Sequence, residues 1–232
     1  MVIGMRAAVL FGPGDIRVTE RQDPVPGPDE VLVKVAMCGT CGTDLKILDG
    51  HFPQTPPFGA FTPGHEWTGT VACQALGAGR VILAGTRPSR LELGRRLGAD
   101  HVIDASAADP VPAILALTGG RGADLTIECS GALAAPQQCA EVTRRGGKIV
   151  VVAFYPGPVT FDLSAVVRKD ITIHTSRGEG GGNVRRAISL AARGKLRGAE
   201  MVTHRFGLDE ISEAFRVVRE RIGDPVKVVI IP

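Results

Sequence analysis

Short apolar segments alternate with helix-like segments along the second half of the chain, and this alternation constrains the fold most strongly. Apolar strands are expected at 81–84, 125–129, 148–153 and 171–174. Helices are expected at 89–97, 111–117, 133–144 and 183–193. Apolar strands separated by helices are typical of a parallel sheet that is covered on both faces. From residue 80 onward, the sequence therefore predicts an α/β domain.

The first part of the chain and its last residues have a different pattern. Residues 5–10 and 15–19 predict a short hairpin, and four prolines within 49–64 predict an irregular loop. Near the C-terminus, we expect Asp209 to cap a helix with Ile211, Phe215 and Val218 on one face. A terminal strand at 226–231 is expected after that helix.

Composition and charge exclude several classes of function. The formal net charge of +3 is too small to favour nucleic acid or a membrane surface as a partner. No apolar run is long enough for a spanning helix, and the first residues lack a signal-peptide layout. Five cysteines, an odd number, argue against a disulfide scaffold. We therefore expect a cytoplasmic protein.

Five residues in the first part of the chain could form a catalytic zinc site. Cys41, His65 and Glu66 have side chains that bind zinc, and three protein ligands leave a fourth position for water. Asp44 could orient His65 by accepting its second ring proton. Thr43 could pass an alcohol proton outward. The alternative is that Cys41 is a buried small side chain and His65 a loop histidine with ordinary partners.

Cys38 and Cys41 also have the spacing of a redox Cys-x-x-Cys motif. That motif opens a helix early in a thioredoxin-like unit. Here it follows an expected strand in a proline-rich β region. The redox interpretation is therefore disfavoured.

Several segments in order resemble the zinc-dependent medium-chain dehydrogenases, and most closely the sorbitol and threonine dehydrogenase branch. The segments are Met37–Lys46, Pro63–Thr70, Gly122–Gly131, Arg145–Val150 and His204–Glu210. The resemblance covers nearly the whole chain. It implies a GroES-like catalytic domain, a Rossmann domain, catalytic zinc, and a small alcohol, polyol or ketone as substrate, and it allows a homo-oligomer.

A block that this family carries is missing around Thr70 to Leu76, where Ala72–Gly77 resembles the end of the helix after the lost glycine turn. It comprises the four-cysteine structural-zinc lobe, a further catalytic zinc ligand, and the first Rossmann strand with its Gly-x-Gly-x-x-Gly turn. The predicted fold is α/β, with an incomplete GroES-like domain and a Rossmann-like parallel sheet that lacks its first strand. We assign 1–71 to the catalytic domain, 72–204 to the cofactor domain and 205–232 to a return to the catalytic domain.

Two other glycine-rich segments do not replace the lost turn. Gly77–Ile82 enters a strand instead of a helix. Gly178–Asn183 lies between a strand and a helix, but no strand with an acidic end follows it at the required distance. We expect the latter to be a flexible loop.

The end of the second Rossmann strand indicates the preferred cofactor. NAD-binding folds place an acidic residue there for the ribose hydroxyls. This chain has Gly85 and Thr86, followed by Arg87, whose guanidinium suits a 2′-phosphate, with Arg90 as a second candidate. The alternative is that Arg87 is a solvated residue at a helix start. By resemblance, Ser130 and Gly131 lie in the turn after the fourth strand and contact the cofactor.

Three functions are therefore consistent with the sequence. The first is a zinc-dependent, NAD(P)-linked oxidoreductase that prefers NADP and interconverts an alcohol or polyol with its ketone or aldehyde. The second is a non-catalytic remnant or deletion product of such an enzyme. The third is a zinc- or nucleotide-binding module without turnover. Because of the lost block, we expect both zinc binding and cofactor binding to be weak.

Overall fold

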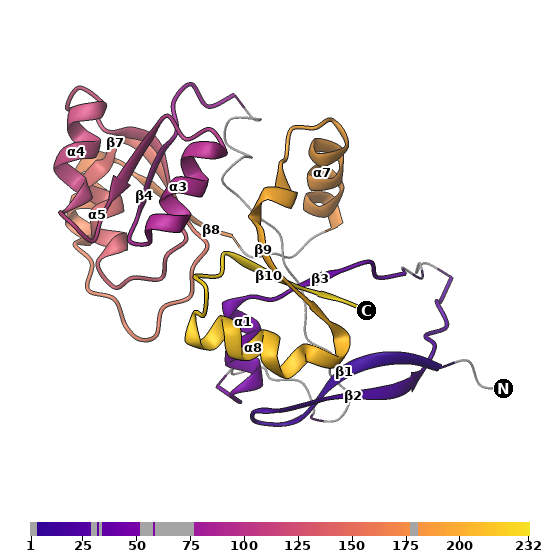
Figure 1. Cartoon of the computed structure of the whole chain (residues 1–232). Coiled ribbons are helices and arrows are strands. Elements are labelled where there is room, and N and C mark those ends of the chain that lie inside the picture. Colours follow the sequence, from indigo (N-terminus) through magenta and orange to yellow (C-terminus); the bar gives the residue numbers. More distant parts are fainter. Residues whose placement is uncertain (1–3, 29–31, 33, 52–57, 59–76, 177–180) are drawn as a thin grey trace. The chain divides into compact units, whose positions relative to one another are not determined.

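The computed structural model describes residues 4–28, 32, 34–51, 58, 77–176 and 181–232, and it divides the chain into two compact units (Figure 1). Unit 1 comprises residues 1–69 and 197–232, and unit 2 comprises residues 70–196. The two halves of unit 1 thus come from opposite ends of the sequence. His65 and Glu66 lie outside the described residues.

Unit 1 is built from a hairpin, a small mixed sheet and two helices. Its elements are β1 (Gly4–Gly12), β2 (Asp15–Gln22), β3 (Cys38–Gly39), α1 (Gly42–Leu48), η1 (Gly198–Met201), β9 (Val202–Gly207), η2 (Leu208–Glu210), α8 (Ile211–Glu220) and β10 (Lys227–Ile231). β1 and β2 pair antiparallel. β10 lies between β3 and β9, antiparallel to the first and parallel to the second. The C-terminal strand therefore pairs with the N-terminal segment that carries Cys38.

Helix α8 closes the core of unit 1 as its apolar pattern predicts. Ile211 and Phe215 are buried, and Val218 packs against the same cluster. Asp209 does not cap this helix, contrary to expectation. It belongs to η2 and pairs with Arg6, whereas Glu210 is the N-cap and makes no side-chain capping bond. The acidic residue that precedes a helix is here held by a cation from the other end of the chain.

Unit 2 alternates strands and helices. Its elements are β4 (Ile82–Gly85), α3 (Pro88–Arg96), β5 (His101–Asp104), α4 (Pro110–Leu117), β6 (Ala123–Glu128), α5 (Ala135–Val142), β7 (Thr143–Val151), α6 (Leu163–Lys169), β8 (Thr172–Thr175) and α7 (Gly181–Ala192). All strand pairs in this unit are parallel. The predicted α/β class is confirmed.

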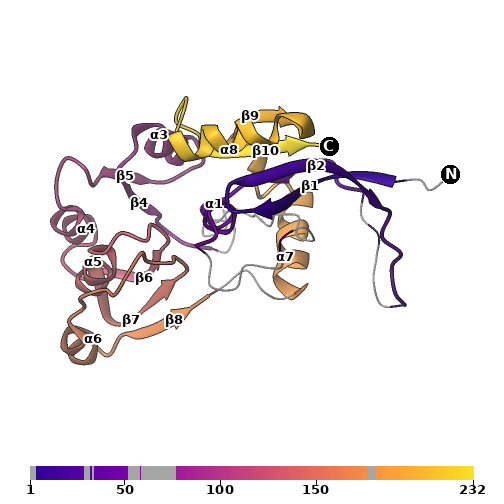
Figure 2. The same ribbon diagram turned by 90° about the horizontal axis from the view of Figure 1, so that it is seen from below.

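The parallel strands of unit 2 form two separate ladders (Figure 2). One contains β4 and β5, and the other has the order β6-β7-β8. In a doubly wound sheet with strand order 3-2-1-4-5-6, the first strand lies between the second and the fourth. β4 and β6 correspond to those two strands. Among the strands that the structure describes, β4 pairs with β5 alone and β6 pairs with β7 alone. The described sheet is therefore interrupted where the first strand would lie.

The two faces of β6 differ in exposure. Leu125 and Ile127 lie on one face and are 48% and 44% exposed. Thr126 lies on the opposite face and pairs with Ile149 of β7, which is 2% exposed and belongs to a small core with Ala140, Val166 and Ile171. The described core of this ladder therefore lies on one face of the sheet.

Candidate active site

The predicted metal ligand Cys41 lies at the N-terminus of α1, in unit 1. It is the N-cap residue, and its Sγ accepts a hydrogen bond from the backbone N–H of Thr43 at 3.1 Å. In return, Asp44 Oδ2 accepts a hydrogen bond from the backbone N–H of Cys41 at 2.8 Å. This reciprocal arrangement is a capping box, with cysteine in the place of serine or threonine. It fixes the direction of the thiol.

Asp44 has a structural role that the sequence prediction did not include. Its side chain is fully buried and satisfies a backbone donor at the start of α1. The spacing Cys41-x-x-Asp44 could have indicated this role, because it places the acid at the third helical position. The predicted contact between Asp44 and His65 lies outside the described residues. Thr43, the predicted proton carrier, is half-buried in the first turn of α1.

The predicted zinc ligands are compatible with zinc in their chemistry. Cys41 supplies sulfur, and His65 and Glu66 would supply nitrogen and oxygen, which are the donor atoms that zinc takes in proteins. The N–H of Thr43 on Cys41 Sγ is the kind of contact that orients a ligand from outside the coordination sphere. Within the described part of the chain, no three His, Cys, Asp or Glu side chains gather as a metal site.

Cys38 does not have the environment of a redox cysteine. Burial raises the pKa of its thiol, and the nearby Asp44 raises it further, while Lys227 opposes both with a smaller effect. A reactive cysteine needs the opposite shift, because the thiolate is the nucleophile. The thiol also lies near the carbonyl of Gly39, with Sγ 3.7 Å from the oxygen. These contacts agree with the sequence argument against a redox pair.

The residues predicted to select the cofactor lie at the carboxyl end of β4 in unit 2. Gly85 is the last residue of the strand, Thr86 is exposed, and Arg87 is the N-cap of α3. Arg90 is exposed in the first turn of that helix. A Cβ atom at Gly85 would lie 3.2 Å from the Cδ2 atom of Leu91, so this position has little spare room.

Ser130 and Gly131 follow the carboxyl end of β6, and a buried carboxylate holds both of them. Glu128 is 2% exposed. Its Oε1 accepts hydrogen bonds from Ser130 N at 2.8 Å, Ser130 Oγ at 2.6 Å and Gly131 N at 3.1 Å. Its Oε2 accepts a hydrogen bond from the hydroxyl of Tyr155. The backbone N–H groups of Ser130 and Gly131 and the Ser130 hydroxyl, which belong to the predicted cofactor residues, therefore all donate to Glu128.

Glu128 and Tyr155 were missed in the sequence analysis. Burial alone would raise the pKa of the Glu128 carboxyl, but hydrogen bonds from Ser130, Tyr155 and Gly131 outweigh it and lower that pKa. For Tyr155, burial and the bond to Glu128 both raise the pKa. The available signal was the single acid at the end of the apolar segment 125–129.

Comparison with known proteins identifies the lineage of the chain. Residues 68–193, more than half of the sequence, match the profile of the zinc-binding dehydrogenases. The chain belongs to this family. The match starts ahead of β4 and extends through α7, so it covers nearly all of unit 2.

Curated members of the family differ from this chain in length. The sorbitol dehydrogenase of Halalkalibacterium halodurans is 29% identical over 337 aligned positions, which cover 95% of this chain and 97% of that protein. The L-threonine 3-dehydrogenase of Bacillus subtilis is 34% identical over 161 residues, which cover 68% of this chain but 46% of that protein. An alignment of 337 positions against a chain of 232 residues means that the sorbitol dehydrogenase carries a long block that this chain lacks. This agrees with the predicted internal deletion.

Solved structures show the same fold at low sequence identity. The 2R,3R-butanediol dehydrogenase of Bacillus subtilis superposes with a TM-score of 0.84 at 19% identity, covering 98% of this chain and 99% of that chain. A protein of Sinorhizobium meliloti, described as a zinc-binding dehydrogenase bound to NADP, gives 0.79 at 23% identity, covering 99% of this chain and 100% of the other. Membership of the medium-chain dehydrogenase fold is therefore shown. In the described residues, no helix has the length and apolar character needed to cross a membrane.

Proposed function

We propose that the chain is a zinc-dependent, NADP-preferring oxidoreductase by descent, acting on an alcohol or polyol and its ketone or aldehyde. The family match over residues 68–193 carries this proposal. Cys41, His65 and Glu66 would hold the metal. Bound there, zinc would polarise the substrate oxygen and lower the pKa of the alcohol. The Thr43 hydroxyl, placed in the first turn of α1 beside Cys41, would carry the proton outward.

The cofactor preference rests on what the end of β4 lacks. A carboxylate at Gly85 would repel a 2′-phosphate, and none is present there. Arg87 follows at the start of α3, where its guanidinium has the planar geometry for a phosphate. The NADP in the related Sinorhizobium meliloti structure is compatible with this preference.

A second candidate, the non-catalytic remnant, is favoured by the interruption of the sheet. In doubly wound folds, the cofactor binds beyond the carboxyl ends of the strands, where the strand order reverses. That point lies between β4 and β6, which belong to separate ladders in this chain. The glycine turn that would cradle the pyrophosphate belongs to the lost strand. This argues for weak binding even where the specificity residues remain.

Metal analysis and cofactor titration of the full chain test the proposal. We expect weakly held zinc that is lost in Cys41→Ser and retained in Cys129→Ser, because Cys129 is exposed and lies in unit 2. We expect NADPH to bind more tightly than NADH, with the difference reduced in Arg87→Ala and kept in Arg95→Ala. Arg95 is a matched control because it lies on the same helix and pairs with Glu92.

The opposite outcomes are equally specific. One tightly held zinc would contradict the weak-binding expectation and strengthen the enzyme hypothesis. Absence of zinc and of both cofactors from the wild-type chain would favour the remnant. Tight NADH binding, or an NADPH affinity unchanged in Arg87→Ala, would show that the cofactor site has been misassigned.

A further inference from the structure

The carboxylate of Glu128 connects two loops at the carboxyl edge of unit 2. One loop follows β6 and contains Ser130 and Gly131, which donate to Oε1. The other follows β7 and contains Tyr155, which donates to Oε2. Both carboxylate oxygens are therefore used, and each serves a different loop. Such charge-assisted hydrogen bonds are stronger than neutral ones, especially where water is excluded.

The backbones of the same two loops also lie against each other. Gly131 has a φ of +71°, and a Cβ atom there would lie 2.8 Å from the carbonyl oxygen of Phe154. Only glycine tolerates both this conformation and this approach. Within the first loop, Ser130 Oγ also accepts a hydrogen bond from Ala132 N at 3.1 Å. The turn is thus fixed on several sides around the Glu128 carboxylate.

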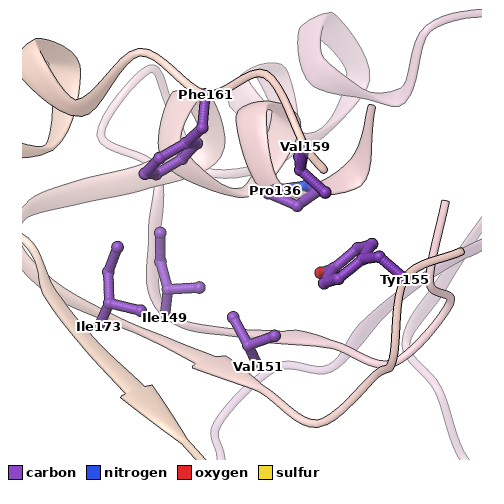
Figure 3. Close-up of a pocket in the computed structure, with 7 residues that line it drawn as sticks. All are labelled: Pro136, Ile149, Val151, Tyr155, Val159, Phe161 and Ile173. Carbon is purple, nitrogen blue, oxygen red and sulfur yellow. The ribbon is translucent and has the colours of Figure 1, made fainter. Parts of the chain in front are cut away.

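The ring of Tyr155 faces an apolar pocket. It lines a cavity of about 330 Å³ together with Pro136, Ile149, Val151, Val159, Phe161 and Ile173 (Figure 3). These residues come from α5, β7, β8 and the loop after β7. The ring therefore has apolar surroundings, while its hydroxyl donates to Glu128. Tyr155→Phe removes this hydrogen bond and keeps the ring at the pocket.

We propose that Glu128 and Tyr155 form a positioning pair that joins the loops after β6 and β7 into one rigid rim for the nicotinamide cofactor. This rests on the proposed function, because the cofactor would bind beyond the carboxyl ends of these strands. Neither residue has to touch the cofactor. The pair acts by holding Ser130 and Gly131, so that the cofactor meets a turn that is already in place.

Three variants of the full chain test the pair. Tyr155→Phe removes one hydroxyl and keeps the ring. Glu128→Gln keeps an oxygen for Ser130 and Gly131, and its amide nitrogen can donate to the Tyr155 oxygen, so it keeps the hydrogen-bond partners and removes the charge. Phe161→Leu is the control, because Phe161 lines the same cavity and is not among the partners of Glu128.

Two readouts are compared in each variant. The first is amide hydrogen exchange over residues 129–132 and 153–156, and the second is NADPH titration by calorimetry. In Tyr155→Phe, we expect faster exchange in both loops and an NADPH affinity lower by about tenfold, which is the order expected for one hydrogen bond to a charged group. In Phe161→Leu, the NADPH affinity should be unchanged. In Glu128→Gln, the loops stay joined by neutral hydrogen bonds, so both readouts should lie between those of wild type and Tyr155→Phe.

Failure of this inference differs from failure of the proposed function. Wild-type chain that binds neither NADPH nor NADH would remove the proposed function and, with it, the positioning role. If the wild type binds NADPH, unchanged exchange in Tyr155→Phe would show that the pair does not hold the loops. Faster exchange with unchanged affinity would show that the rim does not position the cofactor. An equal loss of affinity in Phe161→Leu would assign the effect to the cavity instead of the hydroxyl.

Discussion

The hydrophobic cores of the two units differ in extent among the described residues. Among the described residues, eleven buried side chains of unit 1 form one cluster, drawn from β1, β2, α1, α8 and β10. The corresponding cluster of unit 2 contains four, from α5, β7, α6 and the residue before β8. In unit 1, the described strands and helices close on each other. In unit 2, the described parallel strands form two separate ladders, with no described strand between β4 and β6.

The central strands of the two units differ in how they are paired. In unit 1, β10 has a hydrogen-bonded neighbour on both sides. The first Rossmann strand is central, so its absence leaves an unpaired edge on β4 and on β6 within the described sheet. An apolar strand that loses a neighbour loses both hydrogen bonds and burial.

The largest expected effects come from deleting one large side chain in each core. Phe215→Ala in unit 1 should lower the free energy of unfolding by about 3–5 kcal/mol, since Phe215 is 2% exposed within the larger cluster. Ile149→Ala in unit 2 should cost less, about 2 kcal/mol, because its smaller cluster offers fewer contacts to lose. Urea unfolding followed by circular dichroism measures both. A larger loss for Ile149→Ala would reverse the comparison.

A glycine at the start of β6 tests how closely the remaining strands of unit 2 pack. Gly122 has a φ of +88°, and a Cβ atom there would lie 2.6 Å from the carbonyl oxygen of Val142, the last residue of α5, and 2.9 Å from the backbone N of Arg144 in β7. Gly122→Ala should therefore destabilise unit 2 by about 3 kcal/mol through backbone strain and a clash with backbone.

Gly120→Ala is the matched control for that substitution. Gly120 also has a positive φ, +77°, but a Cβ atom there would have no neighbour within 4 Å among the described residues. Gly120→Ala should therefore lower the free energy of unfolding only by the cost of the positive φ, about 1 kcal/mol. Equal melting temperatures for the two variants would mean that β6 and β7 are not in close contact at this point.

A smaller effect on the free energy of unfolding is expected from Lys169, which donates hydrogen bonds to backbone carbonyl groups at the C-terminus of α5. Lys169 Nζ donates to the carbonyl oxygens of Ala140, Glu141 and Thr143, at 3.0, 2.7 and 3.1 Å. Lys169→Met keeps much of the aliphatic stem and removes these bonds. We expect a loss of about 1–3 kcal/mol in the free energy of unfolding. Arg168→Met, which removes an exposed ion pair with Asp162, should change it by less than about 1 kcal/mol.

The smallest effect is a dependence on pH carried by Glu128. The pKa of the Glu128 carboxyl is lowered in the folded state. Its contribution to the free energy of unfolding is therefore present above the ordinary carboxyl pKa and is lost as the pH falls through the folded-state pKa. Unfolding of the wild type should therefore become easier below about pH 4.3. Glu128→Gln should lack this part of the acid sensitivity. Identical acid profiles for the two proteins would show that Glu128 is not held as described.

Much of the fold could be predicted from the sequence, because it depends on local patterns. The expected helix at 89–97 is α3, and Gly98 follows it with a φ of +100°. The face formed by Ile211 and Phe215 is buried as expected. The predicted α/β class followed from the order of the segments, whereas the missing strand was inferred from the family resemblance.

The network around Glu128 could not be predicted in the same way. Tyr155 reaches Glu128 from 27 positions away, across a loop whose path depends on packing. The pairing of Asp209 with Arg6, in place of the expected helix cap, is likewise a contact between distant segments. Contacts of this kind depend on tertiary structure and have no local sequence signal. The roles assigned to Cys41, His65 and Glu66 at the metal, and to Arg87 at the cofactor, remain proposals.

Amide hydrogen exchange, measured strand by strand, tests most directly the claim that the parallel sheet of unit 2 is interrupted between β4 and β6. We expect strong protection in β7 and β10, which have hydrogen-bonded neighbours on both sides. We also expect that β4 and β6 each contain amides that exchange quickly, because one edge of each strand is unpaired in the described sheet. Protection throughout β4 and β6 as strong as in β7 would contradict the account, since it would require another strand between them.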